Sequence, residues 1–190
     1  TGNSLNNRLS GGPGNDRYVF DTDLALGSDT IDETGVGIDT LDFSPTTTRA
    51  VTINLSLATA QVVNPGLTLT LASDTAMENI IGGAMNDVFA GNLRNNTLTG
   101  GLGNDTYLFD TDLALDTRLQ PDSDTIVELN NEGNDTLDFS ATTTLAVSVD
   151  LSNAASQIVS QTVETETQPS KPKLRLTLGS GTTLENVIGG

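Results

Sequence analysis

Residues 82–108 read GGAMNDVFA GNLRNNTLT GGLGNDTYL, which is one nine-residue pattern repeated three times without interruption. Each unit opens with Gly, has Asp or Asn at its sixth position and has a bulky apolar residue at its eighth. Gly and Asn favour tight turns, and the polar–apolar alternation that follows favours a short strand. The sequence therefore predicts a stack of short strands joined by tight turns, which is a repeat architecture.

Further units extend this pattern on both sides. GNSLNNRLS at 2–10 and GGPGNDRYV at 11–19 are full units, and shorter remnants keep only an Asp two residues before an apolar residue. The Asp residues of the remnants are Asp29, Asp39, Asp124 and Asp135. All seven aromatic residues lie two or four positions after a repeat Asp. Side chains at even spacing share one face of a strand, so we expect every ring on the inner face.

A longer period shows that the chain is duplicated. Residues 1–27 match 90–116, and residues 67–83 match 174–190. We therefore predict two tandem copies, 1–89 and 90–190, with loop insertions in the second copy near 117–121 and 161–173. The remaining segments, which include 50–57, 60–63 and 146–152, alternate apolar and polar residues as strands do. The predicted fold is an all-β solenoid with almost no helix.

Composition excludes several functions. The chain has 190 residues with a formal charge of −17 and has no Cys, His or Trp, so it cannot contain a Ser-His-Asp triad, a thiolate nucleophile or a Cys-ligated metal. Strong acidity argues against a nucleic-acid partner and favours hard cations, which take oxygen ligands. No apolar run approaches the roughly 20 residues of a membrane span.

The loops GGPGND (11–16) and GGLGND (100–105) predict the chemistry of the site. Gly lets backbone carbonyl oxygens approach a ligand closely, and the closing Asp adds a carboxylate. Hard oxygens alone suit Ca²⁺, with its 6–8 ligands and flexible geometry, better than the strictly octahedral Mg²⁺. One loop cannot fill a coordination shell, so we expect each ion to lie between two stacked loops.

These units resemble the RTX, or hemolysin-type, calcium-binding nonapeptide repeat G-G-x-G-x-D-x-U-x, in which U is large and apolar. The resemblance implies a right-handed parallel β-roll in which nine residues make half a turn, so that the loop at 82 pairs with the loop at 100. It also implies metal ligands in three half-sites and in the remnants. They are Gly11, Gly12, Pro13, Gly14 and Asp16; Gly100, Gly101, Leu102, Gly103 and Asp105; Gly82, Gly83, Ala84 and Asp87; and Asp29, Asp39, Asp124 and Asp135. Asn7 and Asn96 replace the pattern's Asp, so ion sites there should be weak or absent.

Other acidic residues have simpler interpretations. The pair Asp21 and Asp23, repeated as Asp110 and Asp112, resembles a glycosidase pair, but its spacing places it on the solvent-facing side, and we predict no catalytic residue. A calcium role for this pair remains open. We expect Asp42 on a solvated face. Glu78 and its copy Glu185 are expected to bond to turns and not to ions.

The sequence predicts a calcium-dependent structural module of a secreted or cell-surface bacterial protein, of the adhesin, surface-layer or filament type, that folds on binding calcium outside the cell. The alternative is the C-terminal secretion and folding module of a secreted enzyme or toxin whose catalytic domain lies elsewhere. A carbohydrate-active role is a third possibility, but it has no aromatic platform here. Gly189–Gly190 opens a new unit and Thr1 corresponds to the end of one, so we expect further copies in the same chain or in a filament as partners beside calcium.

Overall fold

The computed structural model describes residues 2–112, 122–128, 132–161, 172–179 and 184–190. Every regular element among them is a β-strand, and the strands form three sheets. In order across each sheet, sheet A contains β1 (Arg8–Leu9), β3 (Gly27–Ile31), β7 (Leu67–Leu71) and β6 (Gln61–Asn64). Sheet B contains β14 (Gln157–Gln161), β15 (Pro172–Leu178), β12 (Asp122–Val127), β10 (Thr97–Thr99), β8 (Asn79–Ile81), β4 (Thr40–Asp42) and β2 (Arg17–Val19). Sheet C contains β16 (Asn186–Ile188), β13 (Thr136–Asp138), β11 (Thr106–Leu108), β9 (Val88–Ala90) and β5 (Thr52–Asn54).

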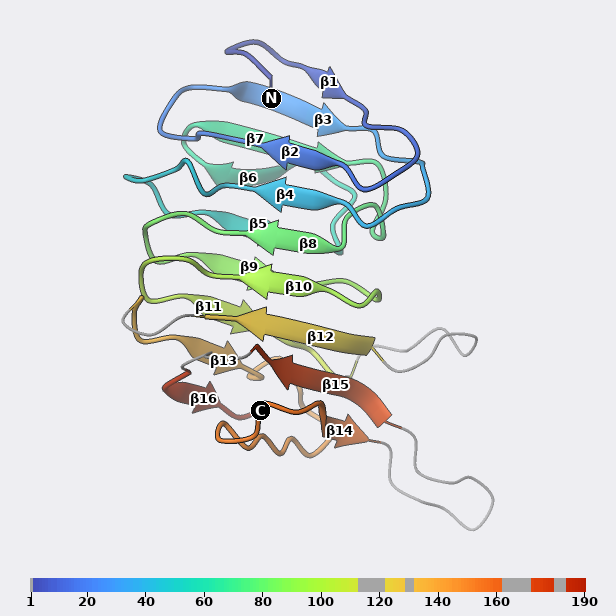
Figure 1. The fold of residues 1–190 in the computed structure, drawn as a ribbon, viewed down its shortest axis with the longest axis vertical. Helices are drawn as coiled ribbons and strands as arrows, with labels where there is room; N and C mark the ends of the chain where they lie inside the picture. Colours follow the sequence, from blue (N-terminus) through green and yellow to red (C-terminus); the bar gives the residue numbers. More distant parts are fainter. Residues whose placement is uncertain (1, 113–121, 129–131, 162–171, 180–183) are drawn as a thin grey trace.

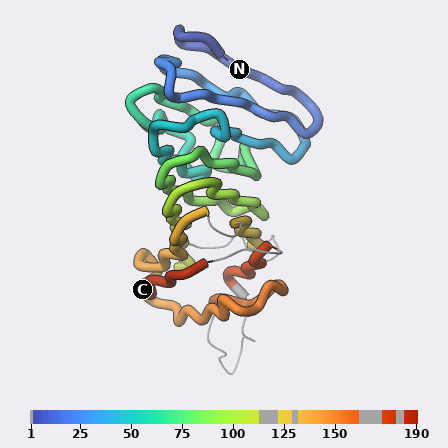
Figure 2. The backbone as a smooth tube through the Cα atoms, turned by 60° about the vertical axis from the view of Figure 1, so that its left-hand side comes forward, coloured from blue at the N-terminus to red at the C-terminus, as the bar shows by residue number. Residues whose placement is uncertain are grey.

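The chain winds as a parallel β-roll, as the repeat predicts. Consecutive short strands alternate between the two faces, and each pairs in parallel with the strand one coil away, as β9 does with β11. Figure 1 shows sheet B in front, with sheets A and C behind it along the long axis. Figure 2 shows the coils stacked from the N-terminal end to the C-terminal end. Two antiparallel hairpins, β6–β7 and β14–β15, interrupt the pattern, and the sequence did not predict them.

The core is a single line of apolar side chains between the faces. All seven aromatic residues are buried, which confirms the expectation from their even spacing. Phe20 stacks on Phe43 with ring centroids 5.6 Å apart, and Phe109 stacks on Phe139 at 5.1 Å. Because one ring lies above another from coil to coil, hydrophobic burial holds neighbouring coils at a fixed spacing.

The two copies form one continuous roll. Strand β8 of the first copy pairs with β10 of the second, and β9 pairs with β11. The duplicated strands occupy opposite faces, since β1 and β3 belong to sheet A whereas their copies β10 and β12 belong to sheet B. The domain boundary between residues 89 and 90 stays a prediction.

Three expectations differ from the structure or lie outside it. Residues 146–150 are not a strand, because their first-copy equivalent β5 pairs with β9 and no described strand takes that place beside 146–150. Asp42 is 2% exposed and forms an ion pair with Arg17 at 2.7 Å, so its expected place on a solvated face is wrong. Residues 117–121 and 162–171 of the predicted insertions lie outside the described residues. Within the described ranges there is no helix long and apolar enough to cross a membrane.

Candidate metal centre

A ladder of acidic side chains runs along each edge of the roll. The residue before a strand presents its carboxylate to the backbone N–H of the equivalent residue one coil away. On the edge that precedes sheet C, the Asp87 N–H donates to Asp105 Oδ1 at 2.7 Å, and the Asp105 N–H donates to Asp135 Oδ1 at 2.8 Å. The same pattern joins Asp16 to Asp39 at 2.8 Å on the edge that precedes sheet B. These bonds align the carboxylates one above another.

Two points on these ladders gather three carboxylates each. Asp105, Glu128 and Asp135 lie with one oxygen from each within 4.8 Å of the others. Their first-copy equivalents, which are Asp16, Glu33 and Asp39, form the same cluster. In both clusters the first Asp closes a GGxGxD loop, the Glu follows a strand of the next coil, and the second Asp precedes the strand after it. The duplication therefore yields two copies of one site.

The second-copy cluster contains carboxylate oxygens that have no hydrogen-bond partner. Asp105 and Asp135 are both fully buried, and the Oδ2 atom of each lacks a partner, although each Oδ1 accepts a backbone N–H. Asp16 Oδ2 in the first copy is also buried and unpartnered. A buried, unpartnered carboxylate oxygen is costly unless a cation or proton meets it. Both clusters therefore fit a cation on these oxygens.

Gly100 leaves the space in which the second cluster converges. A Cβ atom at this position would lie 2.1 Å from Glu128 Oε1, 2.3 Å from Asp105 Oδ2 and 2.6 Å from the Tyr107 hydroxyl. Only glycine fits there. Gly103 has a φ of 118°, a conformation that other residues rarely adopt, and its carbonyl oxygen would lie 1.5 Å from a Cβ on Gly133 of the next loop. The loops thus stack backbone on backbone, with carbonyl oxygens directed between them.

The carboxylates of the second cluster are unfavourable in their charged form unless a positive charge lies beside them. Burial, together with the neighbouring carboxylates, raises the pKa of Asp105 from its ordinary 3.8 to about 7, against the hydrogen bond that Asp105 accepts from the Asp87 N–H. Burial likewise raises the pKa of Glu128 to about 8, against the hydrogen bond that Glu128 accepts from the Tyr107 hydroxyl. Burial also raises the pKa of Asp135. Three desolvated carboxylates at this separation destabilise one another unless a cation neutralises them.

Asp87 takes a different arrangement from Asp105. Its Oδ1 accepts the Val51 N–H and its Oδ2 accepts the Gly83 N–H, both at 2.7 Å. The loops at 82 and 100 do stack, because a Cβ on Gly101 would lie 2.4 Å from the Gly83 carbonyl oxygen, and this confirms their expected pairing. A metal role for Gly82, Gly83, Ala84 and Asp87 stays a prediction.

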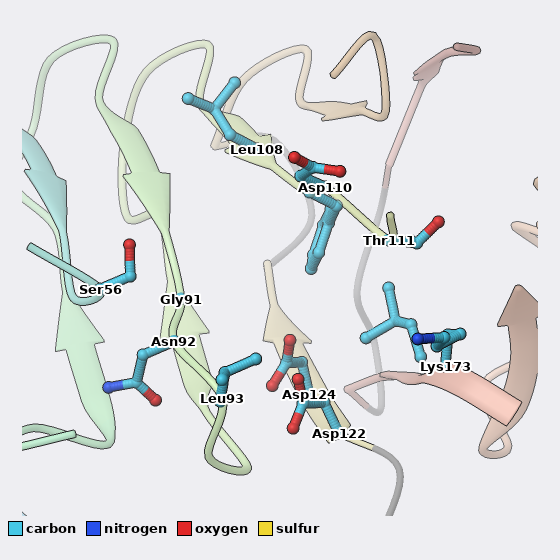
Figure 3. A pocket seen from close by; sticks show the side chains of 12 residues that line it. Ser56, Gly91, Asn92, Leu93, Leu108, Asp110, Thr111, Asp122, Asp124 and Lys173 are labelled. Carbon is cyan, nitrogen blue, oxygen red and sulfur yellow. The ribbon is translucent and has the colours of Figure 1, made fainter. Parts of the chain in front are cut away.

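Asp29 and Asp124 lie beside the loops that carry Asn at the sixth position. Asp124 Oδ1 accepts the Asn96 N–H at 2.9 Å, and Asp29 Oδ1 accepts the Asn7 N–H at 2.8 Å. Asp124 also lines a cavity of about 90 Å³, in which Figure 3 shows it next to Asp122 on β12. Burial raises the pKa of Asp122 to about 6 and that of Asp124 to about 8. Neither Asp29 nor Asp124 belongs to a three-carboxylate cluster among the described residues.

Asp23, Asp112 and Glu78 have structural partners. Both oxygens of Asp23 accept hydrogen bonds from the backbone and hydroxyl groups of Thr47 and Thr48, at 2.7 to 3.0 Å. In the second copy Asp112 accepts the same kinds of hydrogen bonds from Thr143 and Thr144. This arrangement of one Asp and two threonines is called the clip below. Glu78 accepts the Asp39 N–H at 2.9 Å, which confirms the expectation that it bonds to a turn. The clip therefore gives the Asp23 carboxylate a structural role.

Sequence reasoning missed Glu33, Glu128 and the two tyrosine hydroxyls that bond to them. Tyr18 donates to Glu33 just as Tyr107 donates to Glu128. The signal was present, because both copies keep a Glu two residues after the remnant strand and a Tyr at the eighth position of the GGxGxD unit. Positions at which the two copies agree outside the nonapeptide would have identified both glutamates.

Comparison with known proteins yields one family. Residues 29–188 match the family model described as peptidase M10 serralysin C terminal. This range includes all three carboxylates of the second cluster and two of the three in the first. No curated protein matches the chain.

Proposed function

The chain belongs to the peptidase M10 serralysin C-terminal family, and from that premise we propose that it is a calcium-dependent structural module of a secreted or cell-surface bacterial protein. The RTX-type repeats of this family bind calcium, and the domain is the non-catalytic repeat part of secreted bacterial peptidases. We assign this chain no catalytic role. Its task is to form a rigid roll when calcium is present.

One observation carries this proposal. Asp105 Oδ2 and Asp135 Oδ2 are buried without partners in a cluster that Glu128 completes. The cluster offers oxygen ligands, which suit the 6–8 oxygen ligands of Ca²⁺. The first cluster offers the equivalent set with Asp16 as its unpartnered member.

The three carboxylates of each cluster come from two neighbouring coils. The first Asp comes from one loop, whereas the Glu and the second Asp come from the loop of the next coil. An ion bound to all three would join two coils that otherwise repel each other. The tyrosine hydroxyl holds the glutamate in place by donating a hydrogen bond to it. Calcium supplies positive charge and coordination, and the side chains supply a preformed cradle.

The energetics explain folding outside the cell. With external calcium about tenfold above a site Kd of ~10⁻⁴ M, each ion stabilises the folded state by RT ln(1 + 10), which is about 1.4 kcal/mol. Submicromolar cytosolic calcium removes this contribution. A chain with a formal charge of −17 and a thin core depends on such contributions, because net stability is only about 5–15 kcal/mol in ordinary domains. We infer that the chain stays expanded inside the cell and folds on export.

The family match supports a second candidate. Its description places such domains at the C-terminal end of a peptidase, so this chain could be the secretion and folding module of a secreted enzyme or toxin. The first candidate includes adhesin, surface-layer and filament proteins, in which further copies of the repeat would be the partners. The sequence that flanks the chain in its parent protein separates the two, because a catalytic domain occurs only in the second.

Far-UV circular dichroism with calcium and with EDTA tests the shared claim. We expect a β-sheet spectrum and a cooperative thermal transition in calcium, and loss of both in EDTA. Isothermal titration calorimetry should count at least two ions per chain. An EDTA spectrum and melting temperature identical to those in calcium would overturn the proposal.

A further inference from the structure

The five full nonapeptide loops adopt two conformations. In the loops that end at Asn7, Asp87 and Asn96, the side-chain oxygen of this sixth residue accepts the backbone N–H four residues earlier, each at 2.7 Å. Among the hydrogen bonds of the described residues, Asp16 and Asp105 accept no such bond. The first conformation is called closed below, and the second is called open.

The fourth position of the unit separates the two conformations. Both open loops have Gly there, at Gly14 and Gly103, with φ of 122° and 118°. The closed loops have Leu5, Met85 and Arg94 at this position. The open loops also have positive φ at their second position, at Gly12 and Gly101. A side chain strongly disfavours positive φ, so the open conformation, which leaves the Asp carboxylate unpartnered, requires Gly at the fourth position.

In loop 91–96 the side-chain amides of two Asn residues donate hydrogen bonds. In an open loop, by contrast, one Asp carboxylate oxygen has no hydrogen-bond partner. The Asn96 side-chain amide donates to the Glu78 carbonyl oxygen at 3.0 Å and to Asn92 Oδ1 at 3.1 Å. The Asn92 amide donates to the Met77 carbonyl oxygen at 2.7 Å. Asn92 and Asn96 are 8% and 1% exposed, so water does not compete for these bonds. The Arg94 side chain adds positive charge that lowers the pKa of Glu78, against the burial that raises it.

We propose that loop 91–96 is a calcium-independent clasp that joins the two copies, in which the amides of Asn92 and Asn96 take the place of an ion. The inference rests on the proposed function, because it contrasts this clasp with calcium at the open loops. It divides the roll into two kinds of junction. The coils at 16–39 and 105–135 need calcium, whereas the coils of β8 and β10 stay joined by amide hydrogen bonds when calcium is withdrawn.

A loop exchange tests which residues decide the conformation. Loop 91–96 reads GNLRNN and loop 100–105 reads GGLGND, so three substitutions convert either loop into the other. We expect N92G/R94G/N96D to lose the hydrogen bonds of Asn92 and Asn96, and therefore to lose stability equally in calcium and in EDTA. The reverse exchange, G101N/G103R/D105N, should bind one calcium ion fewer than the natural chain. Calorimetry gives the ion count, and the slope of folding free energy against the logarithm of calcium concentration gives it independently.

Asn96→Ala tests the clasp without creating a site. Loss of its hydrogen bonds should shift the folding equilibrium about tenfold toward the unfolded state. The shift should be the same in saturating calcium and in EDTA with enough trimethylamine oxide to fold the natural chain. Asn95→Ala in the same loop is the control, because Asn95 is exposed and, among the described residues, its side chain accepts one hydrogen bond, from the Ser123 N–H.

The outcomes separate this inference from the proposed function. An unchanged ion count for Asn96→Ala with equal loss in both conditions supports the clasp. Loss of an ion in Asn96→Ala, or a stability loss confined to calcium, would overturn it, as would an N92G/R94G/N96D variant that keeps its full stability in EDTA. If the natural chain bound no calcium at all, the proposed function would be overturned. The clasp would still be tested by whether Asn96→Ala loses the same folding stability in calcium and in EDTA.

Discussion

Replacement of Asp105 by Asn should stabilise the chain more without calcium than with it. The Asn side chain keeps an oxygen that accepts the Asp87 N–H, because that bond uses only one carboxylate oxygen. It removes the charge and the second oxygen, Oδ2, which has no partner in the described structure. The substitution therefore isolates the contribution of this oxygen to a bound ion.

The structure sets the size of each effect. Without calcium, Asp105 is buried and its pKa is raised from 3.8 to about 7, which corresponds to a cost of up to about 4 kcal/mol for keeping it ionised at neutral pH. Asn has no such cost, so the calcium-free variant should be more stable than the natural chain. With calcium about tenfold above its Kd, the natural chain gains about 1.4 kcal/mol from the ion, and a variant that binds no ion there does not. The stability advantage of the variant should therefore shrink by about this amount in calcium.

Urea unfolding followed by circular dichroism measures both effects. The calcium-free arm uses EDTA with trimethylamine oxide added until the natural chain folds. Asp87→Asn is the matched control, because both Asp87 oxygens accept backbone N–H groups and an amide would lose one of these bonds in either condition. If Asp105→Asn changes the free energy of unfolding by the same amount with and without calcium, the carboxylate has a structural role only and the reasoning fails.

Three further predictions follow from other parts of the roll. Gly100→Ala should abolish one calcium site, because its Cβ would enter the carboxylate cradle; calorimetry should count one ion fewer than for Gly189→Ala, whose Cβ meets nothing within 4 Å. The Asp112 clip should make stability depend on pH. Hydrogen bonds from the two facing threonines hold the pKa of Asp112 well below its usual range, so the clip stabilises the fold above about pH 4 and loses its effect as the pH falls further. Thermal midpoints of the natural chain and Asp112→Asn should therefore converge in acid, and a constant gap would contradict this. Phe139→Ala should cost about 3–5 kcal/mol in calcium because it empties a stacked position in the core, whereas Val36→Ala at an 83% exposed position should cost under about 0.5 kcal/mol in the same urea assay.

The period-nine pattern was sufficient to predict an all-β solenoid, and its resemblance to the RTX repeat specified a parallel roll. A repeat of Asp, one residue, then an apolar residue fixes both the strand and the face that it buries, which is why the burial of Phe89 and Tyr107 followed from spacing alone. The pairing of the loops at 82 and 100 followed from the half-turn length that the resemblance to the RTX repeat implies. These features are local or periodic, so a single sequence contains them.

The parts that the sequence did not reveal depend on contacts between coils. Glu33 and Glu128 reach their sites from the following coil, and their place depends on the length of chain between coils and not on the nonapeptide. Asp42 is buried because Arg17 of the neighbouring strand pairs with it. Asp87 matches the motif, yet its loop closes because Met85 occupies the fourth position. A motif that counts only the sixth residue cannot distinguish an open carboxylate from a closed one.

Terbium luminescence tests the central claim most directly. The chain has two tyrosines and no tryptophan, and each tyrosine hydroxyl bonds to the glutamate of one cluster. In a Tyr18→Phe variant, Tyr107 alone can sensitise terbium, a hard cation that takes the same oxygen ligands as calcium. We predict saturable terbium emission on tyrosine excitation that calcium displaces and that Asp105→Asn abolishes. Emission that is absent at saturating terbium, or that Asp105→Asn leaves unchanged, would contradict an ion held between the stacked loops.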